Sequence, residues 1–173
     1  RKKSGQYAVH ERSSVMPVII DYGVGNLFSL TSSFKFIGQD VTVTSDKKKI
    51  AAADKLILQG VGAFSDAAKA LKETGMYDVV REEAAKGKPL LGICLGMQML
   101  LTKSYEYGEH DGLDLIPGNV KPIAPIIGSE LKVPHIGWNA LHFTRESYLF
   151  KYIKNNDCVY FVHSFYATDC DDS

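Results

Sequence analysis

From Pro17 onward, short apolar runs of strand length alternate with longer helical patterns, and no other feature restricts the possible folds as strongly. The alternation predicts an α/β fold with an open, mostly parallel sheet flanked by helices. We expect strands at 17–21, 41–44, 55–59 and 89–93, and helices at 27–37, 63–73, 76–86 and from residue 97 to 101.

The second half of the chain differs in character, because glycine and proline punctuate it between residues 108 and 134. Short strands are predicted around Val120 and Leu131, and a long aromatic-rich strand at 157–167. Residues 1–15 are polar and aperiodic, so we interpret them as a disordered leader, an upstream read-through or an expression remnant. Residues 16–173 are expected to form one domain, since no linker divides them.

Composition excludes some function classes. Twenty basic and twenty acidic residues cancel, so no overall field draws the chain to nucleic acid or to a membrane surface. No apolar stretch reaches the length of a membrane span. The three cysteines are widely spaced, and no histidine stands at metal-ligand spacing from them, so we expect no metal site and a reducing, cytoplasmic location.

The run Lys-Pro-Leu-Leu-Gly-Ile-Cys-Leu-Gly-Met-Gln at 88–98 places Cys94 on a glycine-flanked turn from a strand into a helix. At such a position, peptide dipoles and unpaired backbone N–H groups favour the thiolate over the thiol. The pattern is that of a nucleophile elbow with sulfur in place of the serine oxygen, so Cys94 is the candidate nucleophile. An inert buried cysteine remains the alternative on this pattern alone.

Two glycine-rich turns follow predicted strands. Gly60-Val61-Gly62 could direct backbone N–H groups at a developing oxyanion, or could be only a tight turn between strand and helix. Such turns gather at the carboxyl edge of a parallel sheet, where Cys94 is also expected, and this favours the oxyanion role. The turn at 21–27 resembles a dinucleotide fingerprint, but Phe28 stands where the third glycine belongs, which argues against a nucleotide cofactor.

A cysteine hydrolase also needs a base, usually a histidine, and the chain has five. His10 falls in the expected leader, His110 in a charged loop and His142 on an edge strand, without distinctive surroundings. His135 lies among proline, glycine and the single tryptophan, and His163 shares a strand face with phenylalanines. We interpret His163 as a core or interface residue, so the nucleophile lacks a convincing base within residues 1–173.

Together these segments carry a resemblance to a known family. Gly92-Ile93-Cys94-Leu95-Gly96-Met97-Gln98 resembles the nucleophile motif of class I glutamine amidotransferases, which have a flavodoxin-like α/β fold. Other segments narrow the resemblance to the glutaminase subunit of imidazole glycerol phosphate synthase, and it extends from Pro17 to about Tyr166. These segments are 21–27, 60–64, 112–113, 116–118, 133–139 and 160–164.

The resemblance implies that Cys94 attacks the side-chain amide of glutamine and that ammonia leaves from a tetrahedral oxyanion. Water would then release glutamate from a γ-glutamyl thioester. Backbone N–H groups aimed at the oxyanion would contribute more in a dry site than in water. By position, the residues that would hold the oxyanion and the substrate are Gly60, Val61, Gly62, Leu95 and Gln98.

The resemblance further implies a heterodimer without a cofactor. Ammonia would pass through the subunit interface to a cyclase subunit with a (β/α)₈ barrel. That subunit makes imidazole glycerol phosphate and an aminoimidazole carboxamide ribotide in histidine biosynthesis. By position, the residues that would contact the cyclase or lie near its interface are Asn26, Pro134, His135, Trp138 and Tyr160.

The sequence departs from the family pattern at two places. The family commonly has proline before Gly-Val-Gly, whereas Gln59 here frees φ and adds an N–H, so the balance between loop conformers is expected to differ. The family's base and orienting acid occur as His-Pro-Glu, which residues 1–173 do not contain. The resemblance therefore implies that the chain as given lacks the C-terminal strands of the domain and has impaired turnover. His163 matches an earlier motif and does not fill this role.

Three other interpretations stay open. A non-catalytic module that keeps only the cyclase-docking surface is favoured by the missing His-Pro-Glu and disfavoured by the intact cysteine turn. A glutaminase serving another synthase, such as those for anthranilate or pyridoxal phosphate, is disfavoured by the 134–139 segment. A cysteine hydrolase of the heat-shock-protease type has the least support.

Overall fold

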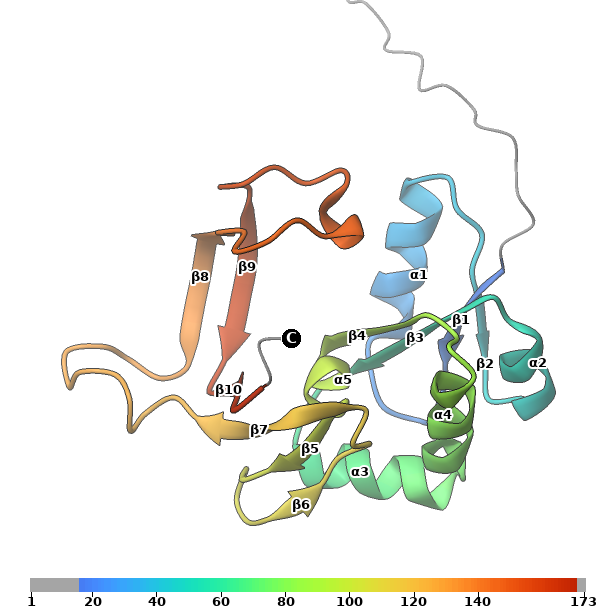
Figure 1. Ribbon diagram of the computed structural model, residues 1–173, viewed down its shortest axis with the longest axis horizontal. Helices are drawn as coiled ribbons and strands as arrows, with labels where there is room; N and C mark the ends of the chain where they lie inside the picture. Colours follow the sequence, from blue (N-terminus) through green and yellow to red (C-terminus); the bar gives the residue numbers. More distant parts are fainter. Residues whose placement is uncertain (1–15, 171–173) are drawn as a thin grey trace, which may run out of the picture.

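The computed structural model describes residues 16–170, and the predicted leader at 1–15 lies outside the described residues. A parallel sheet forms the first half, in the order β2-β1-β3-β4 (Figure 1). Its strands are β1 (Pro17–Ile20), β2 (Thr42–Thr44), β3 (Lys55–Gly60) and β4 (Leu90–Cys94). The predicted α/β class with a mostly parallel sheet is confirmed.

Four helices connect these strands: α1 (Leu27–Phe36), α2 (Lys47–Ala52), α3 (Phe64–Glu73) and α4 (Met76–Ala85). No helix within residues 16–170 is long and apolar enough to cross a membrane. In Figure 1, α1 lies above the sheet and α3 and α4 lie below it. The sheet is therefore flanked by helices on both faces, as predicted.

The main core lies between the parallel sheet and helices α3 and α4. Side chains alternate along a strand, so Val18 and Leu56 join this core while Ile19 points to the opposite face. Helix α1 has no buried residue, so it covers that opposite face only partly. The two lower helices contribute the buried side chains of Phe64, Ala67, Leu71, Met76 and Val80.

The second half of the chain forms a mixed sheet and a separate hairpin. The mixed sheet has the order β10-β7-β5-β6 and contains β5 (Leu101–Ser104), β6 (His110–Asp111), β7 (Ile116–Pro122) and β10 (Phe165–Thr168). The antiparallel hairpin consists of β8 (His135–Ala140) and β9 (Cys158–His163), with a 3-10 turn η1 (Tyr148–Phe150) in the connection. Figure 1 shows the hairpin extending away from the parallel sheet.

Three predicted elements of this half differ from the structure. The helix expected at 97–101 is α5 (Leu95–Gln98), and Leu101 begins β5, because so short an apolar run suits either a helix or a strand. No strand forms around Leu131, where closely spaced prolines and glycines favour turns. The strand expected at 157–167 is interrupted at Ser164, where the chain changes its partner strand from β8 to β7.

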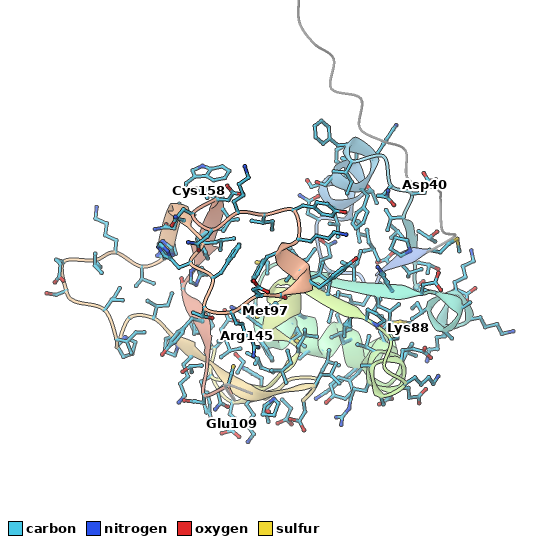
Figure 2. All side chains as sticks on the ribbon, turned by 45° about the horizontal axis from the view of Figure 1, so that its top comes forward. Asp40, Lys88, Met97, Glu109, Arg145 and Cys158 are labelled. Atoms are coloured by element: carbon cyan, nitrogen blue, oxygen red, sulfur yellow. The ribbon has the colours of Figure 1, made fainter. Side chains whose placement is uncertain are left out.

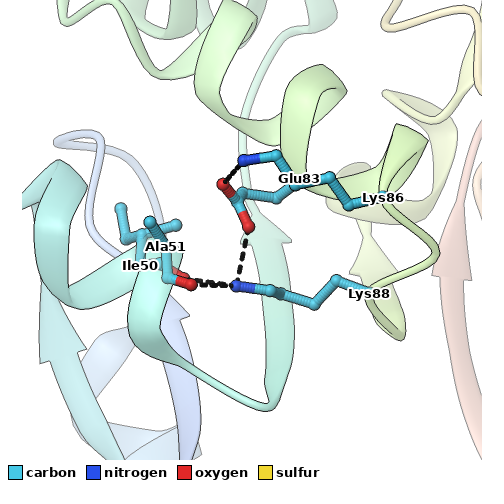
Figure 3. Close-up of polar contacts among 5 residues, drawn as sticks. All are labelled: Ile50, Ala51, Glu83, Lys86 and Lys88. Atoms are coloured by element: carbon cyan, nitrogen blue, oxygen red, sulfur yellow. Dashed lines mark hydrogen bonds and ion pairs between the residues drawn. The ribbon is translucent and has the colours of Figure 1, made fainter.

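A buried carboxylate ties α4 to its neighbours (Figure 3). Glu83 is 4% exposed, and its two oxygens contact the ammonium groups of Lys86 at 2.6 Å and Lys88 at 2.7 Å. These hydrogen bonds, first that of Lys86, hold the pKa of the Glu83 carboxyl below its usual value. Lys88 also donates to the carbonyl oxygens of Ile50 and Ala51 at the end of α2. One lysine before β4 therefore joins two helices.

Candidate active site

β4 ends at Cys94 and α5 begins at the next residue, so the chain turns sharply at the cysteine. Cys94 has φ 55° and ψ −122°, a backbone conformation that residues other than glycine rarely adopt. Such conformations cost about 1–3 kcal/mol each and cluster at active sites. The thiol is exposed to solvent. The predicted strand-to-helix turn is confirmed, and the alternative of a buried, packed cysteine is wrong.

Close backbone packing holds this turn against β3. Gly60 of β3 is paired with Cys94 in the register of the sheet. A Cβ added to Gly96 would lie 2.1 Å from the carbonyl oxygen of Leu58. One added to Gly60 would lie 2.8 Å from the hydroxyl of Tyr22 and 3.2 Å from the backbone nitrogen of Gly96. Gly96 therefore lets α5 and β3 touch through their backbones, and Gly60 also leaves room for Tyr22. This contact sets Cys94 beside the glycine-rich loop that follows β3.

A hollow of about 410 Å³ opens at the carboxyl ends of β3 and β4, where parallel sheets commonly bind ligands. Every residue predicted to hold the oxyanion or the substrate lines it except Gly60, which is buried. The hollow thus collects residues from both halves of the chain. Its lining residues are Val61, Gly62, Cys94, Leu95, Gln98, Glu106, Tyr107, Pro134, Val162, His163, Ser164 and Phe165.

Two polar side chains in the hollow are oriented by bonds to the backbone. The side-chain nitrogen of Gln98 donates to the carbonyl oxygen of Phe165 at 3.4 Å, a long hydrogen bond. The carboxylate of Glu106 accepts from the backbone N–H of Phe64 at 2.7 Å, at the start of α3. Sequence analysis misses Glu106, because nothing in the charged segment around it distinguishes it from a solvated residue.

His163 also lines the hollow, but both of its ring nitrogens already have partners. Its Nδ1 lies 2.9 Å from the carbonyl oxygen of Phe165, and its Nε2 lies 3.0 Å from Nδ1 of His135. The Nε2 of His135 in turn lies 2.9 Å from the Oδ1 of Asn139. These contacts hold His163 within the hairpin, and they suit an interface or core histidine better than a free base.

The remaining histidines lie elsewhere. His110 lies in β6 rather than in a loop, and its ring stacks on Phe64 with centroids 6.5 Å apart. The sequence placed His142 on an edge strand, but it lies outside the strands, just beyond the end of β8. His10 lies outside the described residues. Neither described histidine lines the hollow beside Cys94.

The residues predicted to contact a cyclase are distributed over the hairpin and the loop between β1 and α1. Trp138 and Tyr160 are paired across the hairpin, with ring centroids 5.5 Å apart, and they are 69% and 54% exposed. His135 is half-buried beside His163, and Pro134 lines the hollow. Asn26 is the N-cap of α1. The aromatic pair is therefore the part of this set that is most open to a partner.

A larger hollow, of about 710 Å³, lies at the amino-terminal ends of β1, β3 and β4. Apolar side chains such as Phe34, Leu56 and Leu149 dominate its lining, which includes no cysteine, histidine or carboxylate. Size alone therefore does not identify the reactive site. Within residues 16–170, no group of three or more His, Cys, Asp or Glu side chains is placed to hold a metal ion.

Comparison with known proteins agrees with this geometry. The family model "Glutamine amidotransferase class-I" matches residues 18–172, which include the cysteine turn, the glycine-rich loop and the hairpin. The chain belongs to the class-I glutamine amidotransferase family. The hollow around Cys94 is therefore the candidate glutaminase site of this amidotransferase, and the roles of its individual residues remain predictions.

Curated relatives narrow the place of this amidotransferase within the family. It is 49% identical to "Imidazole glycerol phosphate synthase subunit HisH" of Caldanaerobacter subterraneus subsp. tengcongensis, over 86% of the chain and 71% of the relative. The protein of the same name from Aquifex aeolicus is 46% identical, over 90% and 74%. That from Sulfurimonas denitrificans is 49% identical, over 91% and 75%. The predicted resemblance to the glutaminase subunit of this synthase, which acts in histidine biosynthesis, is confirmed.

Solved structures share the fold of this amidotransferase. A crystal structure described as a glutamine amidotransferase superposes with a TM-score of 0.62 at 19% identity, over 86% of the chain and 70% of that structure. A crystal structure described as a GMP synthase protein from Thermoplasma acidophilum gives a TM-score of 0.62 at 16% identity, over 94% and 71%. At these identities the likeness concerns the fold alone, and it agrees with the predicted class.

Proposed function

We propose that the Cys94 thiolate attacks the side-chain carboxamide carbon of glutamine and forms a tetrahedral oxyanion. Collapse of this intermediate expels the amide nitrogen, which takes up a proton and leaves as ammonia, while the carbonyl carbon stays bonded to sulfur. Water then cleaves the γ-glutamyl thioester to give glutamate and the free thiol. The strained, exposed cysteine at the carboxyl edge of the sheet is the observation that carries this proposal.

Backbone N–H groups on two sides of Cys94 are the proposed oxyanion donors. Leu95 is the first residue of α5, and the loop of Gly60, Val61 and Gly62 begins at the strand position paired with Cys94. Removing one such donor typically lowers kcat by about 10²–10³. Because β3 and α5 are in backbone contact, the loop and the thiol keep a fixed spacing, and the donors need little reorganisation when negative charge develops.

Two side chains are proposed to recognise the amino-acid end of glutamine. Glu106 is the single carboxylate among the residues lining the hollow, and it fits the α-ammonium group of the substrate. Its bond to Phe64 N leaves carboxylate capacity for a second donor. Gln98, whose bond to Phe165 is long, is free to turn its amide toward the substrate.

We do not assign the general base to His163. Each of its ring nitrogens is within 3.0 Å of a group other than the thiol. We propose that it forms part of the pocket wall. On this proposal, His163→Asn leaves more glutaminase activity than loss of a general base would, which costs about 10²–10⁴.

The proposed partner is a cyclase subunit with a (β/α)₈ barrel that consumes the ammonia. Relatives are named as a synthase subunit, which fits a chain that acts within a complex. One face of the hairpin presents the pairs Ile136–Val162 and Trp138–Tyr160, all more than half exposed. Exposed aromatic side chains of this kind are typical interface hot spots. The hairpin also contributes to the pocket wall, so an interface there lies next to the site of ammonia release.

A glutamine-mimicking electrophile, 6-diazo-5-oxo-norleucine, tests the reaction on the full-length protein in complex with its cyclase. We expect one adduct, on Cys94, and loss of glutamine hydrolysis in Cys94→Ala. Cys158 and Cys170 are matched internal controls, because both are also free and exposed. Cys158 lies at the far end of the hairpin in Figure 2, away from Met97 of α5. Cys158→Ala and Cys170→Ala are expected to keep activity and labelling.

The same experiment separates the competing interpretations. Equal labelling of the three cysteines, or hydrolysis by Cys94→Ala, contradicts the proposed nucleophile. A complex that assembles through Trp138 but is neither labelled nor active supports the non-catalytic docking module instead. Hydrolysis that is stimulated by an anthranilate-type synthase and not by the cyclase supports the interpretation that the chain is the glutaminase of another synthase.

A further inference from the structure

Gln59, the residue where the family commonly has proline, is one of few buried polar residues in the described chain. It is 6% exposed and is the penultimate residue of β3, which ends at Gly60. A buried side-chain amide needs hydrogen-bond partners, because an unsatisfied one costs about 1–3 kcal/mol. The partners of Gln59 are therefore informative about what this position does.

The side-chain amide of Gln59 faces two backbone N–H groups at the start of α1. Its oxygen and nitrogen are distinguished by their partners, and only the oxygen can accept from N–H groups. In that orientation, the oxygen accepts from Asn26 N at 3.2 Å and from Leu27 N at 3.1 Å. The first N–H groups of a helix have no partner within the helix. The side chain of Gln59, which lies in β3, therefore caps the N-terminus of α1.

The backbone of Gln59 holds the other end of the same loop. The hydroxyl of Tyr22 donates to the carbonyl oxygen of Gln59 at 2.7 Å, in a buried position. Burial raises the pKa of Tyr22 to about 12, so the hydroxyl remains a donor at neutral pH. Residues 22 and 27 are thus both bound to one residue of β3, which fixes the loop between them.

The loop is shaped around this amide. Gly25 has φ 126°, and a Cβ added there would lie 2.5 Å from the terminal amide of Gln59. Glycine at this position lets the loop backbone pass directly over the side chain. The loop ends in Asn26, a proposed cyclase contact, which is hydrogen-bonded to the Gln59 side chain. Gly60, the next residue in the chain after Gln59, begins the proposed oxyanion loop. Gln59 is therefore hydrogen-bonded to one segment and covalently bonded to the other.

We propose that Gln59 is a positioning residue that joins the β1–α1 loop to the oxyanion loop, so that the cyclase acting on Asn26 affects the placement of Gly60–Gly62. The inference rests on the proposed function. A proline at this position cannot make the side-chain bonds to Asn26 and Leu27, so the connection is a property of this chain and not of the family pattern. It acts on the proposed oxyanion loop and touches no substrate.

Three variants in the cyclase complex test the connection. Gln59→Met keeps the length of the side chain and removes the acceptor. Gln59→Glu keeps an acceptor oxygen, and its charge suits a helix N-terminus. Gln39→Met makes the same change at an exposed glutamine beyond α1 and serves as the control. Amide hydrogen exchange at residues 26–27 and 60–62 reports the connection without reference to activity, and glutamine kinetics report its effect on the reaction.

For Gln59→Met, we expect exchange at Asn26 and Leu27 to rise by about tenfold, as for the loss of one hydrogen bond. Stimulation of kcat by the cyclase should fall by about two- to thirtyfold, with KM changed much less. Gln59→Glu should restore both quantities, and Gln39→Met should change neither.

Unchanged exchange and unchanged stimulation in Gln59→Met overturn the inference, as does failure of Gln59→Glu to restore either quantity. If Gln59→Met does not fold, the test uses Gln59→Glu, for which amide exchange at residues 26–27 should equal that of the wild type. Failure of the proposed function is a distinct result. In that case Cys94 is not labelled in the wild-type complex, while the exchange at residues 26–27 still responds to Gln59→Met.

Discussion

The contact between α5 and β3 predicts a large effect of a single methyl group. Gly96→Ala would place a Cβ 2.1 Å from the carbonyl oxygen of Leu58 and 2.9 Å from the Cα of Gln59. Both atoms belong to the backbone of a central strand, so neither can rotate away. An ordinary carbon–oxygen contact is about 3.3 Å, and reaching it requires α5 to move by roughly 1 Å. The thiol of Cys94 would move with the helix.

The size of the effect follows from that displacement. Misplacing a reacting group by about 1 Å can cost about a hundredfold in rate, so we expect kcat/KM for glutamine hydrolysis in the cyclase complex to fall by about this factor. Overpacking costs about 1–3 kcal/mol, and alanine recovers about 1 kcal/mol through its higher helix propensity. The free energy of unfolding should therefore fall by no more than about 2 kcal/mol.

Steady-state glutaminase assays and urea unfolding measure the two effects. Gly128→Ala is the matched control, because its Cβ would meet the end of the Glu130 side chain, which can move aside. We expect this control to behave as the wild type. If Gly96→Ala and Gly128→Ala have the same rate and the same stability, the close approach of α5 and β3 is refuted, together with the argument that it positions Cys94.

Three further predictions concern the ion pairs of α4 and the hairpin face. Lys88→Met leaves the buried Glu83 carboxylate with one exposed partner, so urea unfolding should show a loss of about 1.5–3 kcal/mol; a loss no larger than that of Lys86→Met would contradict this. The Glu83 pKa is lowered on folding, so its contribution to stability is present above the unfolded pKa of about 4.3 and disappears as pH falls through the lower folded pKa. Glu83→Gln should therefore flatten the acid side of the stability profile, and an unchanged slope there would refute the assignment. Trp138→Ala should raise the Kd for the cyclase by about thirtyfold or more, whereas Phe36→Ala, at an exposed aromatic on α1, should leave it unchanged in the same titration.

The first half of the fold could be predicted from local patterns. The elements expected between residues 17 and 93 form within one residue of their predicted bounds, because each apolar run there coincides with a complete strand or helix face. The exception is α2, which the sequence analysis misses. Its six residues include three lysines and show no apolar period, and the cap at Asp46 and the contacts of Lys88 stabilise it instead.

The second half could not be predicted in the same way, because its order depends on contacts between distant residues. β8 pairs with β9 across a long connection, and β10 continues from β9 but pairs with β7. The site shows the same limit. The glycine-flanked turn at Cys94 is a local signal, whereas Glu106 and His163 enter the hollow only through the folding of the mixed sheet and the hairpin.

At Cys94, the positive φ lowers the stability of the fold, while the thiol provides the proposed reactivity. Glycine adopts a φ of 55° without a Cβ clash, so Cys94→Gly should raise the free energy of unfolding by about 1 kcal/mol while abolishing the thiol. On the proposed function, this single substitution would therefore gain stability and lose glutamine hydrolysis.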